Sequence, residues 1–471
     1  TEKNISYKAQ AQIKDIKGKS TGVIDYKKGF DIKYESENLN LSEIGPIADL
    51  QFGGIGKTKG TTKGTSDWAT FQMDINASQF EFEQYYFGEI STHLKYKSGT
   101  LYFEKLKGNI ESTRYQGMLN VDLTKENIRG DIQLPFFRMA DVQQSILKKV
   151  DLEDRFLGSG SGRIQLDTPF DIDQLNFILD ARLFKGEAFG EEYNEASLKA
   201  ESVDGIIILQ QCVLEKEKSR IQLNGTIDTQ LKSQINFTVS NGFLQHSTIL
   251  KKQELPISGT FQARGQILGD LAAPVIKTKA QISQLIFNKK KYKDAVFAYD
   301  NSNKQTNLQF NIPEQLEFLV ILPESNLKSL FVDVNAKNLD IAPILGFVVS
   351  EDSTRSYVIE TSGEISGNFD TNNFWHSEFS STIRNITLNY KANKIETTIP
   401  TNIEMKNGKL FLNEISVIGN RQFLKVTQPF TEEYQTKFVI NSRMNIAFFK
   451  IFAPFIEKID GYSILRLELS I

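Results

Sequence analysis

The 471-residue sequence is poor in the residues that most often carry chemistry or covalent cross-links. It contains one cysteine, Cys212, three histidines, two tryptophans and 11 prolines. A single cysteine excludes a disulfide framework and any zinc site built from cysteines. The 55 Lys and Arg residues nearly balance the 58 Asp and Glu residues, for a net charge of −3, so the composition has no basic footprint for nucleic acid.

Long apolar runs and targeting signals are also missing. No stretch reaches the roughly 18 uncharged apolar residues that span a bilayer as a helix, and the first residues contain no apolar core of a signal peptide. The sequence starts without Met and stops at Leu467–Ile471 while apolar and polar residues still alternate. We therefore expect it to be a piece of a longer chain.

Glycine-containing segments recur at an almost constant interval. They start at Gly53, Gly158, Gly259, Gly363 and Gly461, which are 105, 101, 104 and 98 residues apart. This regularity predicts one continuous array of repeats. The predicted units are 1–52 (partial), 53–157, 158–258, 259–362, 363–460 and 461–471 (partial).

Most of the remaining sequence alternates between apolar and polar residues, which is typical of strands with one dry and one wet face. Short stretches with helical spacing precede the glycine segments, at 41–44, 139–147, 341–345 and 448–452 and, more weakly, at 244–250. Hairpin turns are predicted at 97–99, 241–242 and 407–408. The predicted fold class is all-β: an elongated, twisted, mostly antiparallel sheet curled into a U-shaped groove, with a short helix about every hundred residues.

No set of polar residues forms a recognisable catalytic or metal centre, so we do not expect an enzyme or a cofactor. Gly56-Lys57-Thr58 resembles the end of a phosphate-binding loop, but Gln51 occupies the position of its first glycine. His93, His246 and His376 are more than 100 residues apart, and Cys212 lies in an apolar run that predicts a small buried side chain. The basic cluster Lys289–Lys293 predicts a solvated hairpin tip, with contact to an anionic headgroup or a partner as the alternative.

A groove lined by apolar side chains and open along one side is a solvent for acyl chains, so we predict that lipids bind along it. The residues predicted to line it are Phe71, Met73, Ile75, Leu119, Val121, Leu175, Phe177, Leu179, Ile221, Leu223 and Ile227. Their neighbours are predicted to face water: Gln72, Asp74, Asn120, Asp180 and Asn224.

Part of the third glycine segment resembles a known family. The sequence from Gly265 to Ile276, together with Leu255–Thr260, is similar to the G-x-i-x-G-x-l-x-x-P signature of the TamB group in the AsmA-like superfamily, and 339–345 with 363–369 looks like the same unit again. The resemblance implies a protein of the Gram-negative envelope, anchored in the inner membrane by an N-terminal helix outside this sequence. It also implies phospholipid transport across the periplasm along a β-groove (β-taco) and, as a partner, an outer-membrane barrel protein of the insertase type such as TamA.

Three other interpretations remain open. A transmembrane β-barrel would also show alternation, although it has no use for helical inserts every hundred residues. A surface adhesin or structural β-solenoid would repeat without needing a dry groove. A conduit for lipopolysaccharide would share the groove and differ only in cargo.

Overall fold

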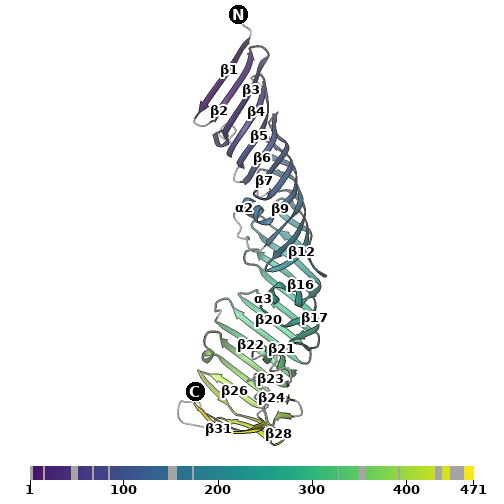
Figure 1. Cartoon of the computed structure of the whole chain (residues 1–471), viewed down its shortest axis with the longest axis vertical. Helices are drawn as coiled ribbons and strands as arrows, with labels where there is room; N and C mark the ends of the chain where they lie inside the picture. The colour runs from purple at the N-terminus through teal and green to yellow at the C-terminus, as the bar shows by residue number, and fades with distance from the viewer. Residues whose placement is uncertain are drawn as a thin grey trace. The chain divides into compact units, whose positions relative to one another are not determined.

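The computed structural model describes most of the chain. The described ranges are 4–13, 16–43, 51–65, 68–82, 85–146, 156–171, 174–326, 328–348, 357–390, 393–429, 437–445 and 461–470. Within them the protein is nearly all β, and its 31 strands belong to one antiparallel sheet (Figure 1). The predicted fold class, an antiparallel sheet with short helices, is confirmed.

The chain divides into two compact units, residues 1–237 with 267–274 and residues 238–266 with 275–471. The elements of unit 1 are β1 (Asn4–Ile13), β2 (Ile16–Asp25), β3 (Gly29–Asn40), η1 (Leu41–Glu43), β4 (Phe52–Gly64), β5 (Ala69–Phe82), β6 (Tyr85–Lys97), β7 (Thr100–Ile110), β8 (Thr113–Asp122), β9 (Asn127–Arg138), α2 (Met139–Ile146), β10 (Phe156–Pro169), β11 (Phe177–Ala188), β12 (Glu191–Val203), β13 (Ile206–Lys216) and β14 (Ser219–Ile227). Strands β15 (Lys232–Phe243) and β16 (Ile257–Asp270) have residues in both units.

The elements of unit 2 are η3 (Leu244–His246), α3 (Thr248–Lys252), β17 (Val275–Phe287), β18 (Lys290–Lys291), β19 (Ala295–Asp300), β20 (Gln305–Ile312), β21 (Leu316–Pro323), β22 (Ser329–Asp340), α4 (Ala342–Val348), β23 (Tyr357–Asp370), η4 (Phe374–His376), β24 (Glu378–Tyr390), β25 (Asn393–Thr397), β26 (Thr401–Lys406), β27 (Lys409–Leu412), β28 (Glu414–Gly419), β29 (Gln422–Thr427), β30 (Lys437–Asn445) and β31 (Tyr462–Ser470).

Strands pair mainly with their neighbours in the sequence. In unit 1 the ladders run from β1 to β14 without a crossover. In the described part of unit 2 the order departs from the sequence at two places. Strand β17 pairs with both β18 and β19, and β24 pairs with both β25 and β26, while β25 pairs with β28. Among the described residues, β1 pairs only with β2 and β31 only with β30, so the sheet is open at both of these strands and is not closed into a barrel.

Short helices lie at four of the places where the helical spacing predicted them, whereas η4 was not predicted. η1, α2, η3 with α3, and α4 each follow a strand and precede the strand that carries a glycine segment. The fifth predicted helix, at 448–452, lies outside the described residues. The repeat boundaries inferred from the glycine interval remain a prediction.

Two of the three predicted hairpin turns are confirmed. Ser98-Gly99 joins β6 to β7, and Asn407-Gly408 joins β26 to β27, with positive φ at both central residues of each turn. The prediction at Asn241-Gly242 is wrong, because both residues lie within β15. Asn241 has a φ of 52°, but Gly242 is not in the left-handed region, so the pair cannot form the two-residue turn.

Candidate functional site

One face of the sheet in unit 1 is apolar and largely withdrawn from water; we call it the dry face. Phe71, Met73 and Ile75 lie on it in β5, and Leu119 and Val121 lie on it in β8. All five belong to or pack against one cluster of buried side chains in β4–β9, in which Val121 is only 1% exposed. Phe71 also stacks on Tyr96 of β6, with ring centroids 5.1 Å apart.

The other predicted lining residues continue along the same face. Phe177 and Leu179 in β11 are half-buried, as are Ile221, Leu223 and Ile227 in β14. Leu175 is half-buried too but precedes β11, so the predicted strand starts two residues too early. The carbonyl of Leu175 instead accepts a hydrogen bond from Ser202 Oγ at 2.6 Å.

The opposite face of these strands is polar. Gln72, Asp74, Asp180 and Asn224 are exposed, whereas Asn120 is half-buried. Ion pairs cross neighbouring strands on this face: His93 Nδ1 lies 2.8 Å from Asp74 Oδ1, and further pairs join Lys63 to Asp31, Arg129 to Asp167, Arg163 to Asp131 and Lys199 to Asp180. The alternation in the sequence therefore corresponds to an alternation in exposure.

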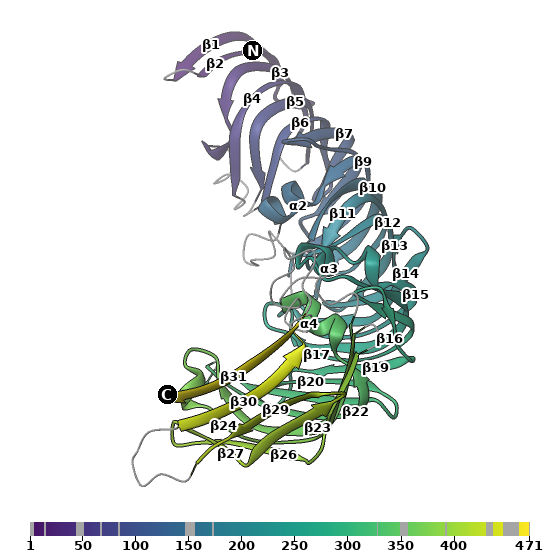
Figure 2. The ribbon, with the colours of Figure 1, turned by 60° about the horizontal axis from the view of Figure 1, so that its bottom comes forward.

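β-bulges explain how a single sheet layer buries its own dry face. Every ladder from β3/β4 to β10/β11 contains a register shift, for example between Phe103 and Leu106 in β7. An extra residue in one strand bends that strand and increases its twist. Strands β3–β6 accordingly curve along their length (Figure 2).

The glycine segment at 158–162 makes one of these bends possible. A Cβ on Gly160 would lie 2.0 Å from the carbonyl oxygen of Arg182, so only glycine allows β10 to approach β11 this closely. Gly158 has a φ of 153° and lies under the ring of Tyr193, whose hydroxyl donates to the carbonyl of Leu157 at 2.9 Å. Burial raises the pKa of the Tyr193 hydroxyl, which keeps the group neutral.

Helix α2 covers part of the dry face. Met139 and Val142 pack against the cluster that contains Phe137 and Leu183. The helix is held there by Asp141, a buried carboxylate that accepts hydrogen bonds from Ser112 Oγ and from the backbone N–H and hydroxyl of Thr113, at 2.8, 2.9 and 2.8 Å. These bonds tie Asp141 to the turn between β7 and β8, so Asp141 positions the helix.

Cys212 lies on the dry face between two strands. Its cross-strand partners are Leu198 in β12 and Leu223 in β14, and its side chain is half-buried. Burial raises the pKa of the Cys212 thiol to about 11. The thiol is therefore a weak nucleophile, and its position makes it a natural reporter beside the predicted lining residue Leu223.

Unit 2 has a second dry face, which the sequence analysis did not identify. The register from β19 to β24 places one row of apolar side chains on the same side. The half-buried members of this row are Phe297, Tyr299, Leu308, Phe310, Phe318, Val320, Leu322, Leu330, Val332, Val334, Ile365, Phe369 and Phe379.

The sequence of the dry face of unit 2 has a recognisable pattern, but it is not the alternation of apolar and polar residues. Strand β21 reads Leu-Glu-Phe-Leu-Val-Ile-Leu-Pro, an almost continuous apolar run. Phe318 and Val320 lie on the dry face, while Leu319 and Ile321 lie on the opposite face, where Ile321 pairs with Phe331. A search for apolar runs bounded by turns would have found this strand.

The basic cluster at 289–293 lies at a hairpin tip with exposed lysines, as predicted. Asn288 and Lys289 form the turn, and Lys290 Nζ lies 2.8 Å from Asp340 Oδ2 at the end of β22. Asp340 Oδ1 accepts the backbone N–H groups of Ala342 and Ile359, both at 3.1 Å. The hairpin tip therefore also helps to fix the connection from β22 through α4 to β23, a contact that the prediction did not include.

The polar face of unit 1 carries a hollow of about 660 Å³ across β8–β11. Gln116, Gln133 and Gln165 line it with Arg163 and Arg182, among others. Gln116 donates to Gln133 at 3.2 Å, and Arg163 is paired with Asp131, which lowers the pKa of that carboxyl. Ser161 and Asp180 also line the hollow, and Asp180 Oδ2 lies 3.8 Å from Lys199 Nζ.

Searches for relatives returned nothing. No family model, no characterised protein and no solved structure matches this chain. Within the described ranges, no helix is both long and apolar enough to cross a membrane. Those ranges also contain no group of three or more His, Cys, Asp or Glu side chains that could hold a metal ion.

Proposed function

We propose that the protein binds phospholipids by their acyl chains along the two dry faces. The observation that carries this proposal is the intermediate exposure of parts of these faces: in β11, β14 and β19–β24, large side chains such as Phe177 and Phe318 are neither buried like a finished core nor fully exposed. A row of half-buried apolar side chains with no polar partner among them can be covered by a flexible hydrocarbon chain.

The energetics favour binding in which the acyl chain has no fixed position along the face. Each methylene removed from water contributes about 0.8 kcal/mol, so two acyl chains gain substantial binding free energy from contact with such a face. Apolar contact is non-directional, so shifting a chain along the strands changes the free energy little. The headgroup stays in water, and the lipid can slide.

The wider role follows from the family resemblance. We propose that the chain moves phospholipids between the inner and outer membranes of a Gram-negative envelope and so supports outer-membrane assembly or homeostasis. The location would be the periplasm, with an inner-membrane anchor outside this sequence and a barrel protein such as TamA as a possible partner. The repeated glycine segments, and the short helices before the segments at Gly53, Gly158, Gly259 and Gly363, are what support this broader proposal.

Cys212 provides a direct test of acyl-chain binding. We expect a phospholipid added from short-chain micelles to slow the reaction of Cys212 with a maleimide, because a chain lying over Leu198 and Leu223 shields the thiol. The ratio of rates with and without lipid is the measured quantity. Mass spectrometry of lipid extracted from the purified protein identifies the cargo, including lipopolysaccharide.

A pair of adjacent variants makes the test specific. Leu223→Asp places a carboxylate on the dry face and should abolish the protection of Cys212, whereas Asn224→Asp places the same charge on the exposed face and should preserve it. Equal rates with and without lipid in the unmodified protein, together with no co-purified lipid, would contradict the proposal. That result would favour a structural or adhesive β-repeat protein.

A further inference from the structure

The connection between β23 and β24 displays two adjacent aromatic side chains to solvent. Phe374 is 51% exposed and Trp375 is 40% exposed, and both belong to the single-turn helix η4. Their rings contact each other edge-on, with centroids 6.0 Å apart. Exposure of two neighbouring large aromatic residues is unfavourable in water, so it calls for an explanation.

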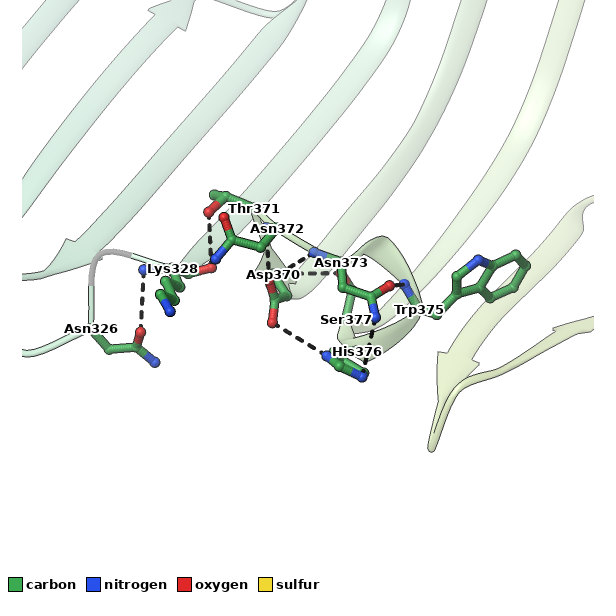
Figure 3. A network of polar contacts seen from close by, with 9 residues as sticks. All are labelled: Asn326, Lys328, Asp370, Thr371, Asn372, Asn373, Trp375, His376 and Ser377. Carbon is green, nitrogen blue, oxygen red and sulfur yellow. Dashed lines mark hydrogen bonds and ion pairs between the residues drawn. The ribbon is translucent and has the colours of Figure 1, made fainter.

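The connection is not a loose loop. Asp370 Oδ1 accepts the backbone N–H groups of Asn372 and Asn373 at 2.8 and 3.0 Å, and the backbone N–H of Asp370 donates to Ser377 Oγ at 3.0 Å (Figure 3). Asn373 Oδ1 accepts the N–H of Trp375 at 3.1 Å. The backbone hydrogen bonds lower the pKa of Asp370, which keeps the turn formed at neutral pH.

The aromatic pair is continuous with the dry face of unit 2. The ring of Phe374 lies 5.8 Å from that of Phe379 in β24, and Phe379 stacks on Phe369 of β23 at 5.0 Å. Phe369 and Phe379 belong to the half-buried row that we propose binds acyl chains. An unbroken apolar path therefore leads from the tip of η4 onto that face.

We infer that Phe374 and Trp375 insert into the interfacial region of a phospholipid bilayer and bring the dry face of unit 2 next to its acyl chains. This inference rests on the proposed function and adds its point of contact with the membrane. Trp is favoured at membrane interfaces because its ring is apolar and its N–H can remain in the polar layer. The exposed Lys328, whose carbonyl accepts the N–H of Thr371 at 2.8 Å, lies beside the turn and is suited to lipid phosphate.

The size of the patch favours a bilayer over a protein partner. Two aromatic side chains that are about half exposed offer on the order of 200 Å² of apolar area. A stable protein interface buries roughly 800 Å² on each partner. Membrane insertion needs only a few side chains, and a single rigid turn can supply them.

The chain has two tryptophans, which makes the test specific. In Trp68→Phe the remaining fluorescence reports on Trp375, and in Trp375→Phe it reports on the exposed Trp68 of unit 1. Each variant is mixed with phosphatidylcholine vesicles whose acyl chains are brominated near the headgroup or near the chain end. We expect a blue shift and strong quenching of Trp375 by the shallow bromines, and neither effect for Trp68.

The partition coefficient of each protein variant between water and the vesicles measures how much each ring contributes to membrane binding. Phe374→Ser and Trp375→Ser should each weaken binding roughly tenfold, from the apolar area lost. Phe411→Ser is the matched control: Phe411 is 46% exposed and pairs with Glu404 on the opposite face, so its loss should leave binding unchanged. Circular dichroism of all three variants identifies any loss of folding.

The outcomes separate this inference from the proposed function. Unquenched Trp375 with intact lipid protection of Cys212 would overturn the membrane contact and leave the acyl-chain site standing. Quenched Trp375 without protection of Cys212 would support the contact and count against the acyl-chain site of unit 1. A blue shift of Trp375 that depends on protein concentration in the absence of lipid would indicate contact with a second copy of the chain and overturn the inference.

Discussion

The two units build their dry faces differently. In unit 1 the ladders from β3/β4 to β10/β11 all contain a register shift, and side chains such as Val121 are almost completely buried. In unit 2 the ladders β19/β20, β20/β21 and β21/β22 are regular and side chains such as Val320 remain half-buried, whereas β22/β23 and β23/β24 each contain a register shift. Bulges bend strands, so a stretch of regular ladders such as β19–β22 closes less over its own apolar face.

The first prediction compares the effect of the same Val→Asp substitution on the dry face of each unit. Val121→Asp places a carboxylate in a buried cluster and should destabilise the protein by several kcal/mol, whereas Val320→Asp should cost about 1–2 kcal/mol because water reaches the site. Urea unfolding of both variants measures the difference. If both variants lose the same free energy of unfolding, the two faces are equally withdrawn from water.

The second prediction removes a bend from unit 1. Gly160→Ala should lower the free energy of unfolding by about 1–3 kcal/mol, because its Cβ would collide with the carbonyl of Arg182. Gly18→Ala in β2 is the matched control, since the nearest atom to its Cβ is 3.9 Å away. If both variants unfold at the same urea concentration, close packing at Gly160 is not what shapes this part of the sheet.

The third prediction compares the strand-to-helix connections of the two units. Asp340→Ala removes the acceptor for Ala342 and Ile359 and the partner of Lys290, and should cost about 1–2 kcal/mol. Asn40→Ala in unit 1 removes only the acceptor for the backbone N–H and hydroxyl of Ser42 and should cost about 0.5–1 kcal/mol. Thermal unfolding measures which variant loses more stability. A larger loss for Asn40→Ala would show that the ion pair with Lys290 does not stabilise the connection.

The smallest expected effect is that of pH on the stability of the protein. Hydrogen bonds to Arg163 lower the pKa of Asp131 in unit 1, and backbone N–H groups lower that of Asp370 in unit 2. A lowered folded-state pKa stabilises the protein above about pH 4, the ordinary Asp value, and this contribution is lost as the pH falls through the lower folded value. Both carboxyls are half-buried and in contact with water, so the melting temperature should decrease only slightly between pH 5 and 3, and Asp131→Asn or Asp370→Asn should flatten that decrease.

The strands of unit 1 could be predicted because each is wet on one face. The alternation in 71–77 and 221–227 identified β5, β14 and the residues on their dry face, and helical spacing located α2 and α4. The same rule missed the dry face of unit 2, because β21 is apolar on both faces. It also could not show that Lys290 reaches Asp340, a contact between residues 50 positions apart.

The strand pattern, most of the short helices and the polarity of the faces of unit 1 follow from the sequence alone, because they depend on spacings of two to four residues within one segment. Where the strands bend, how far each dry face closes and the contacts among the rings of Phe374, Phe379 and Phe369 depend on the tertiary structure. Those features arise from register shifts and close approaches between strands, such as Gly160 against Arg182. Register is a property of two strands together, so neither strand's sequence specifies it alone.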